Sequence, residues 1–241
     1  SCLCKTTTFT VEIPTSNLPL PAHLCHCTTC RRVHGSLAAH HAPIPPPVGL
    51  NCDTLTAYPT PAGVRCFCST CGTNVLDYGE EEKLWVVSTA IFGHEEADRA
   101  FEYRNHIFVE DTRDGGMSDW LPAVRGKEMT RWKTSPYHGS EDTLPLDWHA
   151  PTESGPATTA GADSKPGLVD AEESDTLHAH CHCNGVSFSL QRPDAAKVTP
   201  KNAEKRISRT DPSKWRASVC VCDSCRLAAG SVAVPWAFVT R

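Results

Sequence analysis

The sequence lacks any run of eighteen apolar residues, so no segment is long enough to span a membrane as a helix. It also lacks a basic excess, because 23 Lys and Arg face 28 Asp and Glu, for a net charge of −5. That balance gives no basic field for a nucleic acid, and we expect neither a nucleic-acid nor a membrane partner. The first ten residues, SCLCKTTTFT, lack the basic start and apolar core of a signal peptide, which predicts an intracellular, cytoplasmic location.

Long helical stripes are also missing from the sequence. The 19 prolines and 15 glycines favour short strands, turns and loops, so we predict a mainly β fold. A short helix or loop is expected over 93–104. The candidate strands are 6–13, 36–42, 52–58, 64–68, 73–78, 84–92 and 106–110.

Cysteine, by contrast, is abundant: the chain has 14, and all but Cys52 fall into tight groups. The groups are Cys2/Cys4, Cys25/Cys27/Cys30, Cys66/Cys68/Cys71, Cys181/Cys183 and Cys220/Cys222/Cys225. Cysteines two or three residues apart form strained disulfides with each other, but their sulfurs can converge on one ion. The spacing therefore favours metal ligands, with disulfides and chance clustering as the weaker alternatives.

The cysteine groups recur as an internal repeat. CLCKTTTFTVEI at 2–13 aligns with CHCNGVSFSLQR at 181–192, and LCHCTTCRRVHGS at 24–36 aligns with VCVCDSCRLAAGS at 219–231. We predict a first zinc domain over 1–138, an acidic linker rich in Pro, Gly, Ser and Thr over 139–176, and the front half of a second copy over 177–241. Within this chain Cys181 and Cys183 have no C-x-x-C partner, so the second copy is expected to be truncated and marginally stable.

The spacing of the cysteines separates two kinds of site. Zinc is the default ion for clustered thiolates, and a C-x-C pair with a distant C-x-x-C pair can close a four-sulfur structural site. A C-x-C-x-x-C triplet fills three corners of a tetrahedron and leaves the fourth for a guest. Three thiolates around Zn²⁺ leave a net charge of about −1, which suits holding a soft thiolate better than activating water.

Three ordered motifs, SCLCK, LCHCTTCRRVHGS and RCFCSTCGTNVL, resemble the family of glutathione-dependent formaldehyde-activating enzymes and centromere protein V. The segment HIFVEDTRDGGMSDWLP at 106–122 is similar to one common in fungal members. The resemblance implies a compact zinc-bound β-sheet domain with the fold of the mammalian suppressor-of-Sec protein. It also implies carbon–sulfur lyase chemistry, in which glutathione is joined to formaldehyde as S-(hydroxymethyl)glutathione. The residue after the first C-x-C is often glycine in this family, but here it is Lys5, and Asn184 in the second copy.

The resemblance also assigns the ligands, with two zinc ions in the first domain. The structural zinc would be held by Cys2, Cys4, Cys68 and Cys71. The working zinc would be held by Cys25, Cys27 and Cys30, with its fourth position open to a small thiol such as glutathione. In the second copy the corresponding residues, for which the zinc content stays open, are Cys181, Cys183, Cys220, Cys222 and Cys225. The alternative is a non-catalytic zinc module for binding or assembly.

Several residues near these motifs permit two interpretations. Arg31 and Arg32 either attract the carboxylates of glutathione or only offset the thiolate charge. Cys66 is expected to be a buried residue beside the structural zinc, although it could instead complete the second site or be a surface thiol. His34 is expected in a loop, and His40 and His41 as a solvated pair or at a pocket mouth.

Overall fold

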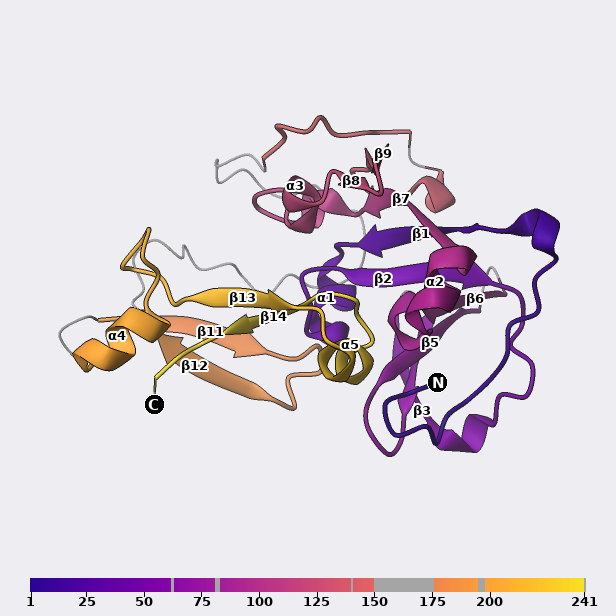
Figure 1. Cartoon of the computed structure of the whole chain (residues 1–241), viewed down its shortest axis with the longest axis horizontal. Helices are drawn as coiled ribbons and strands as arrows, with labels where there is room; N and C mark the ends of the chain where they lie inside the picture. Colours follow the sequence, from indigo (N-terminus) through magenta and orange to yellow (C-terminus); the bar gives the residue numbers. More distant parts are fainter. Residues whose placement is uncertain (62, 81–82, 140, 150–175, 195–197, 241) are drawn as a thin grey trace. The chain divides into compact units, whose positions relative to one another are not determined.

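The computed structural model describes residues 1–240 except 62, 81–82, 140, 150–175 and 195–197 (Figure 1). The chain divides into two compact units, one made of residues 1–158 with 221–234 and the other of residues 159–220 with 235–241. Most of the predicted linker falls at 150–175, outside the described residues. The predicted mainly β fold is confirmed.

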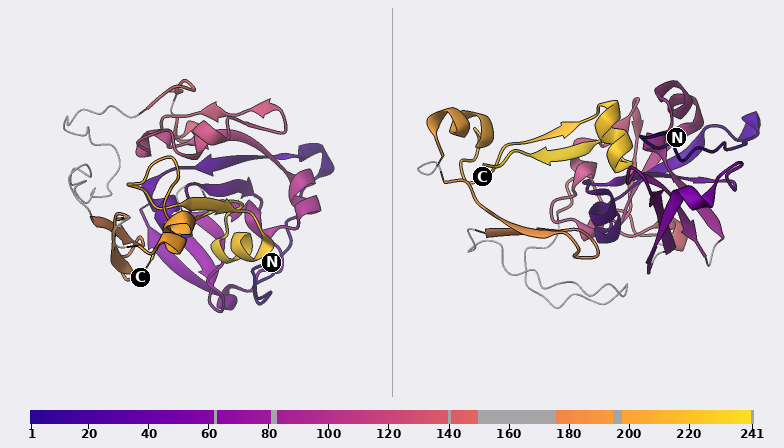
Figure 2. Two further views of the ribbon diagram at one scale, coloured as in Figure 1. Left: turned by 60° about the vertical axis from the view of Figure 1, so that its left-hand side comes forward. Right: turned by 90° about the horizontal axis from the view of Figure 1, so that it is seen from below.

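An eight-stranded sheet organises the first unit, in the order β10-β7-β1-β2-β6-β5-β4-β3. Its neighbours are antiparallel except at β1–β7 and β7–β10, which are parallel. Figure 2 shows these strands from two further directions. Their bounds are β1 (Leu20–Cys25), β2 (Ala39–Ile44), β3 (Leu55–Thr60), β4 (Gly63–Cys68), β5 (Asn74–Gly79), β6 (Leu84–Ser88), β7 (Phe101–Ile107) and β10 (Thr130–Arg131).

The helices of this unit are short, as the absence of a helical stripe predicts. They are α1 (Thr28–His34), α2 (His94–Ala100), α3 (Met117–Trp120) and α5 (Asp223–Ala229), with 3-10 turns η1 (Thr15–Asn17), η2 (Cys52–Thr54), η3 (Thr89–Ile91), η4 (Val109–Asp111) and η5 (Pro136–His138). A small hairpin pairs β8 (Ala123–Val124) with β9 (Lys127–Glu128). Fully buried Ala22, Val75 and Val87 form the main core with half-buried side chains around them. Apolar burial of this kind is the main stabilising term of a sheet domain.

The described residues of the second unit form one helix, one two-stranded sheet and most of another. β11 (Thr176–His180) pairs antiparallel with β12 (Ser187–Gln191), and β13 (Ala217–Cys220) pairs with β14 (Val234–Ala237), whose Val234 belongs to the first unit. Helix α4 (Pro200–Arg206) lies between β12 and β13 in the chain. Among the helices that the structure describes in either unit, none has both the length and the apolar character needed to cross a bilayer.

The first predicted strand, 6–13, is wrong. Residues 6–13 form a loop whose one β-bridge joins Thr10 to Val48, and Phe9 and Val11 pack against the main core. The strand lies instead at β1, where Pro21 in the strand and Pro19 just before it obscured the alternation. The other predicted strands are found with shifted ends, and the segment 93–104 holds helix α2 and the start of β7.

The two C-x-C turns have the same backbone geometry. Lys5 adopts φ +64°, and its N–H donates to the Cys2 carbonyl at 3.1 Å. Asn184 adopts φ +59°, and its N–H donates to the Cys181 carbonyl at 3.2 Å. This left-handed conformation explains why glycine suits the position, since a side chain is strained there.

Candidate metal centre

Four sulfurs converge where the N-terminal turn meets the end of β4. Sγ of Cys4 lies 3.6 Å from Sγ of Cys2 and 3.7 Å from Sγ of Cys68, and with Cys71 all four sulfurs lie within 4.8 Å of one another. A tetrahedral zinc site with bonds of about 2.3 Å has sulfur–sulfur edges of roughly 3.8 Å. A disulfide would need about 2.05 Å. The geometry therefore fits a closed four-thiolate zinc site.

Three sulfurs converge at the junction of β1 and α1. Cys25 ends β1, Cys27 precedes α1 as its N-cap, and Cys30 lies in the first helical turn. Their sulfurs lie within 4.8 Å of one another. The backbone N–H of Cys30 donates to Cys27 Sγ at 3.3 Å, so the helix start fixes the Cys27 side chain. Cys27 is half-buried, whereas Cys25 and Cys30 are buried, which makes Cys27 the most accessible of the three.

The pKa values of the thiols in this cluster are shifted in opposite directions. Hydrogen bonds from Cys25 and Cys30 hold the pKa of Cys27 well below its usual range. The same contact with Cys27 raises the pKa of Cys25 well above its usual range. Such a cluster releases further protons when a cation binds, because metal ligation requires thiolates. In the described part of the chain this group has three cysteine ligands and no fourth His, Asp or Glu.

A known protein family matches the part of the chain that holds these two sites. Residues 1–111 match the model of the family described as glutathione-dependent formaldehyde-activating enzyme. The matched residues are 111 of the 241 in the chain. We call them the GFA domain; they include strands β1–β7 and both cysteine sites. A search of curated proteins finds no significant match to the chain.

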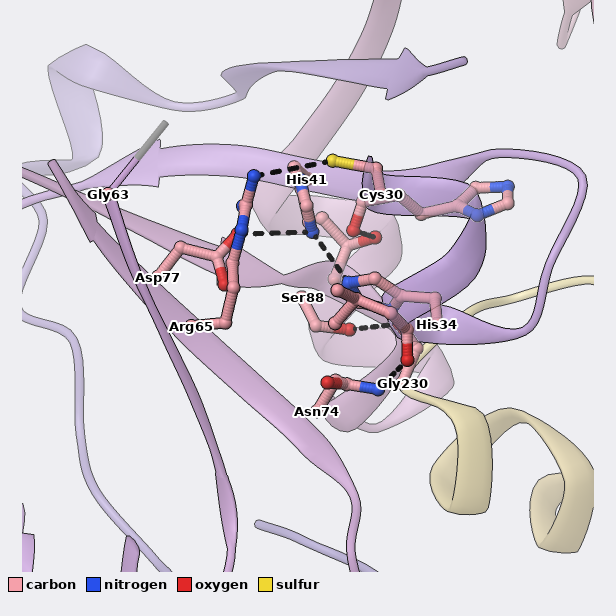
Figure 3. Close-up of polar contacts among 12 residues, drawn as sticks. Cys30, His34, His41, Gly63, Arg65, Asn74, Asp77, Ser88 and Gly230 are labelled. Atoms are coloured by element: carbon pink, nitrogen blue, oxygen red, sulfur yellow. Dashed lines mark hydrogen bonds and ion pairs between the residues drawn. The ribbon is translucent and has the colours of Figure 1, made fainter. Parts of the chain in front are cut away.

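Beside the triplet of the GFA domain lies an arginine that the sequence did not single out. Arg65, on β4, is 7% exposed, and its Nη2 donates to Cys30 Sγ at 3.6 Å (Figure 3). Its Nη1 forms an ion pair with Asp77, the residue opposite it on β5. Burial alone would lower the pKa of Arg65, but the charges of Cys30 and Asp77 outweigh burial and raise it. A permanent cation therefore contacts one sulfur of the triplet.

Two histidines extend this contact chain. Nε2 of His41 lies 3.6 Å from Asp77 Oδ2 and 3.2 Å from Nε2 of His34 (Figure 3). Burial lowers the pKa of His34 to about 4 and that of His41 well below its usual range. Both rings are therefore neutral at pH 7, and the ion pair of Arg65 with Asp77 carries the charge in this chain of contacts.

The expectations for the neighbouring histidines are wrong. His40 and His41 are buried, with 1% and 3% of their surface exposed, rather than solvated or lining a pocket mouth. His34 is the buried last residue of α1 and not a loop residue. Uncharged imidazoles fit this interior because most of their ring nitrogens are paired with hydroxyls, carbonyls or each other.

Cys66 is half-buried and packs against the cluster that contains Cys2 and Cys68. Burial raises its pKa to about 11, as for a thiol that stays protonated. It does not join the sulfurs of the triplet. Cys66 therefore lies beside the cluster of the four-sulfur site, as expected, but it is half-buried rather than fully buried.

The two arginines after the triplet differ in their contacts. The Nε of Arg31 donates to the His26 carbonyl at 2.8 Å, and its Nη2 donates to the Asp111 carbonyl at 3.0 Å. Asp111 in turn accepts from the Thr28 N–H at 2.9 Å. Arg31 thus holds the loop after β7 against α1, while Arg32 is half-buried with no role that the structure singles out.

In the second predicted copy, the sulfurs of Cys181 and Cys183 are 3.6 Å apart, the same separation as Cys2 and Cys4. The triplet Cys220, Cys222 and Cys225 again has its sulfurs within 4.8 Å of one another. The assignment of all these cysteines as zinc ligands stays a prediction.

Proposed function

We propose that the GFA domain binds a small thiol such as glutathione at a zinc ion held by Cys25, Cys27 and Cys30, and forms or breaks a carbon–sulfur bond there. The single observation that carries the proposal is a cluster of three sulfurs without a fourth ligand among the described residues. A zinc ion in this cluster would supply a soft Lewis acid suited to a thiolate. We propose two zinc ions for the domain, the second in the four-cysteine site.

The reaction that the family name suggests is the addition of a thiol to formaldehyde, and it needs no oxidant or further reactant. The thiol loses its proton, its sulfur forms a bond to the carbon of formaldehyde, and the C=O π bond breaks. The resulting alkoxide takes a proton, which gives S-(hydroxymethyl)glutathione. The reverse reaction cleaves the same carbon–sulfur bond.

The residues of this chain would aid that step electrostatically. Arg65 contacts Cys30 Sγ and offsets the excess negative charge of three thiolates, which would otherwise repel an incoming thiolate. Because His34 and His41 have lowered pKa values, they add no cation at pH 7. Half-buried Cys27 marks the side of the triplet from which a substrate could approach.

A non-catalytic zinc module is the second candidate. The observation that favours it is the burial of Cys25 and Cys30, which are only 4% and 3% exposed. A site this enclosed could serve only to hold the β1–α1 junction.

Native mass spectrometry of the reduced chain, with and without glutathione, separates the two candidates. Cys27→Ser should leave the domain folded, lose one zinc and lose a glutathione adduct. Cys68→Ser should unfold the domain, because a structural zinc site contributes on the order of 10 kcal/mol. Cys52→Ser, an exposed cysteine outside every group, is the control and should change neither count.

A glutathione adduct that depends on Cys27 would justify assays with formaldehyde. Two zinc ions without any adduct would favour the non-catalytic module. If Cys27→Ser and Cys68→Ser behave alike, the separation into a working and a structural site is wrong.

A further inference from the structure

Residues 222–234 belong to the predicted second copy, yet they lie within the first compact unit. Locally this segment repeats α1 and its surroundings. Helices α1 and α5 each have seven residues and each follow a cysteine N-cap. Each ends at a left-handed glycine, Gly35 with φ +60° and Gly230 with φ +62°. The next serine closes both turns with the same bond, since Ser36 N–H donates to the Arg31 carbonyl and Ser231 N–H to the Arg226 carbonyl, both at 3.1 Å.

These equivalent residues meet each other. Ser36 Oγ and Ser231 Oγ are 2.9 Å apart. Each hydroxyl also lies near the same two carbonyls: Ser36 Oγ is 3.0 Å from Ala38 O and 3.1 Å from Ala233 O, and Ser231 Oγ is 3.3 Å and 3.4 Å from them. Ala38 and Ala233 are themselves equivalent in the repeat. A contact in which residue i meets its own counterpart is isologous, as at a two-fold axis.

We propose that this face of the GFA domain is a self-complementary pairing surface for a second GFA repeat, and that residues 222–234 of the same chain occupy it. The partner is therefore a copy of the strand–helix–strand segment around C-x-C-x-x-C-R. The pairing does not depend on the thiol chemistry proposed above.

The end of α5 is bound by side chains of the first copy. Its last carbonyls have no partner within the helix and need one elsewhere. The Ala229 carbonyl accepts a hydrogen bond from Asn74 Nδ2 at 3.2 Å and lies 3.2 Å from His34 Nδ1. The Gly230 carbonyl accepts from Ser88 Oγ at 2.6 Å (Figure 3). Three elements of the domain, α1, β5 and β6, thus supply the polar partners of this helix end.

A buried charge adds to the specificity of the contact. Arg226 is 7% exposed, and its Nη1 donates to the carbonyls of Ala90 and Phe92, the second at 2.9 Å. Its Nε donates to Asp223 at 2.8 Å. A guanidinium is buried only where such acceptors are in place, so this docking position is chemically defined.

The two equivalent glycines provide a matched test. An added Cβ at Gly230 would lie 2.3 Å from the backbone oxygen of Asn74, whereas one at Gly35 meets nothing within 4 Å. Both have the same left-handed conformation, so Gly230→Ala and Gly35→Ala carry the same backbone strain. They differ only in the clash with the pairing surface.

The measurement is hydrogen exchange of the full zinc-loaded chain, read by mass spectrometry in peptides that cover 88–92 and 231–234. Gly230→Ala should raise the exchange rate of both segments by about tenfold or more, because the docked state is destabilised. Gly35→Ala should leave both rates near those of the parent chain. Unchanged zinc content shows that the domain itself stays folded.

Equal effects of the two alanines would overturn the proposal, since strain alone would then explain them. Unchanged exchange at 88–92 in Gly230→Ala would also overturn it. If Gly230→Ala fails to fold, Arg226→Gln replaces it: the shorter amide cannot reach both carbonyls, and faster exchange at 88–92 is again the expected result.

Discussion

The ion pair between Arg65 and Asp77 allows charge balance at the triplet to be tested apart from folding. Only 7% of Arg65 and 13% of the Asp77 side chain are exposed. Burial raises the pKa of the Asp77 carboxyl, and Arg65 opposes that rise. Arg65→Leu removes the cation and leaves Asp77 buried and uncompensated.

The expected cost is large. Removing one partner of a buried ion pair typically costs 3–5 kcal/mol, and partial exposure of Asp77 suggests about 3 kcal/mol here. Replacing both partners removes the uncompensated charge, so Arg65→Leu with Asp77→Leu should return to within about 1 kcal/mol of the parent chain. The free energy of unfolding from urea titration of the zinc-loaded protein measures both values.

The folded double variant then tests the site itself. It lacks the cation beside Cys30, so the uncompensated thiolate charge should repel the glutathione thiolate and weaken its binding about tenfold, or about 1.4 kcal/mol. Zinc content should stay that of the parent chain. The reasoning fails if Arg65→Leu costs less than about 1 kcal/mol, or if the double variant is no more stable than the single one.

Two further predictions concern stability. Lys5→Gly should raise the free energy of unfolding by about 1 kcal/mol, because Lys5 has φ +64°; Lys5→Ala keeps the strain, and equal stability of the two variants would contradict this. Burial lowers the pKa of His40 to about 3. Below about pH 6.5 the His40 imidazole therefore takes up a proton in the unfolded chain but not in the folded one, which lowers the free energy of unfolding. Between pH 7 and pH 5 the parent chain should therefore lose about 2 kcal/mol more than His40→Gln, and parallel losses in thermal or urea unfolding would refute it.

The fold was predictable where local pattern decides it. Short β segments and turn residues indicated the mainly β domain, and the strands β3 to β6 lie close to their expected positions. The segment 6–13 failed because alternation alone cannot tell a strand from a loop that follows a hydrogen-bonded turn. The strand β1 was missed because Pro19 and Pro21 are typical of connections.

The cysteine groups were predictable because ligands two or three residues apart must converge. Arg65 carries no such spacing signal. Its partner Asp77 lies across the β4–β5 pair, and only the register of that pair brings them together. His40 and His41 looked solvated because polar residues are usually exposed. Instead His40 pairs with Ser231 and His41 with His34, and burial keeps both rings neutral by lowering their pKa values.

The contact between Ser36 and Ser231 also bears on how the sequences of the two predicted copies can diverge. In a symmetric pair of identical chains, one substitution near the two-fold axis changes both halves of the interface at once. In one chain that carries both copies, each side changes alone. The helix ends already differ: His34 occupies the place that Ala229 holds in the predicted second copy, and its ring lies 3.2 Å from that residue's carbonyl. The predicted tandem arrangement would thus allow the first copy to keep the thiol site proposed above while residues 222–234 specialise as its structural support.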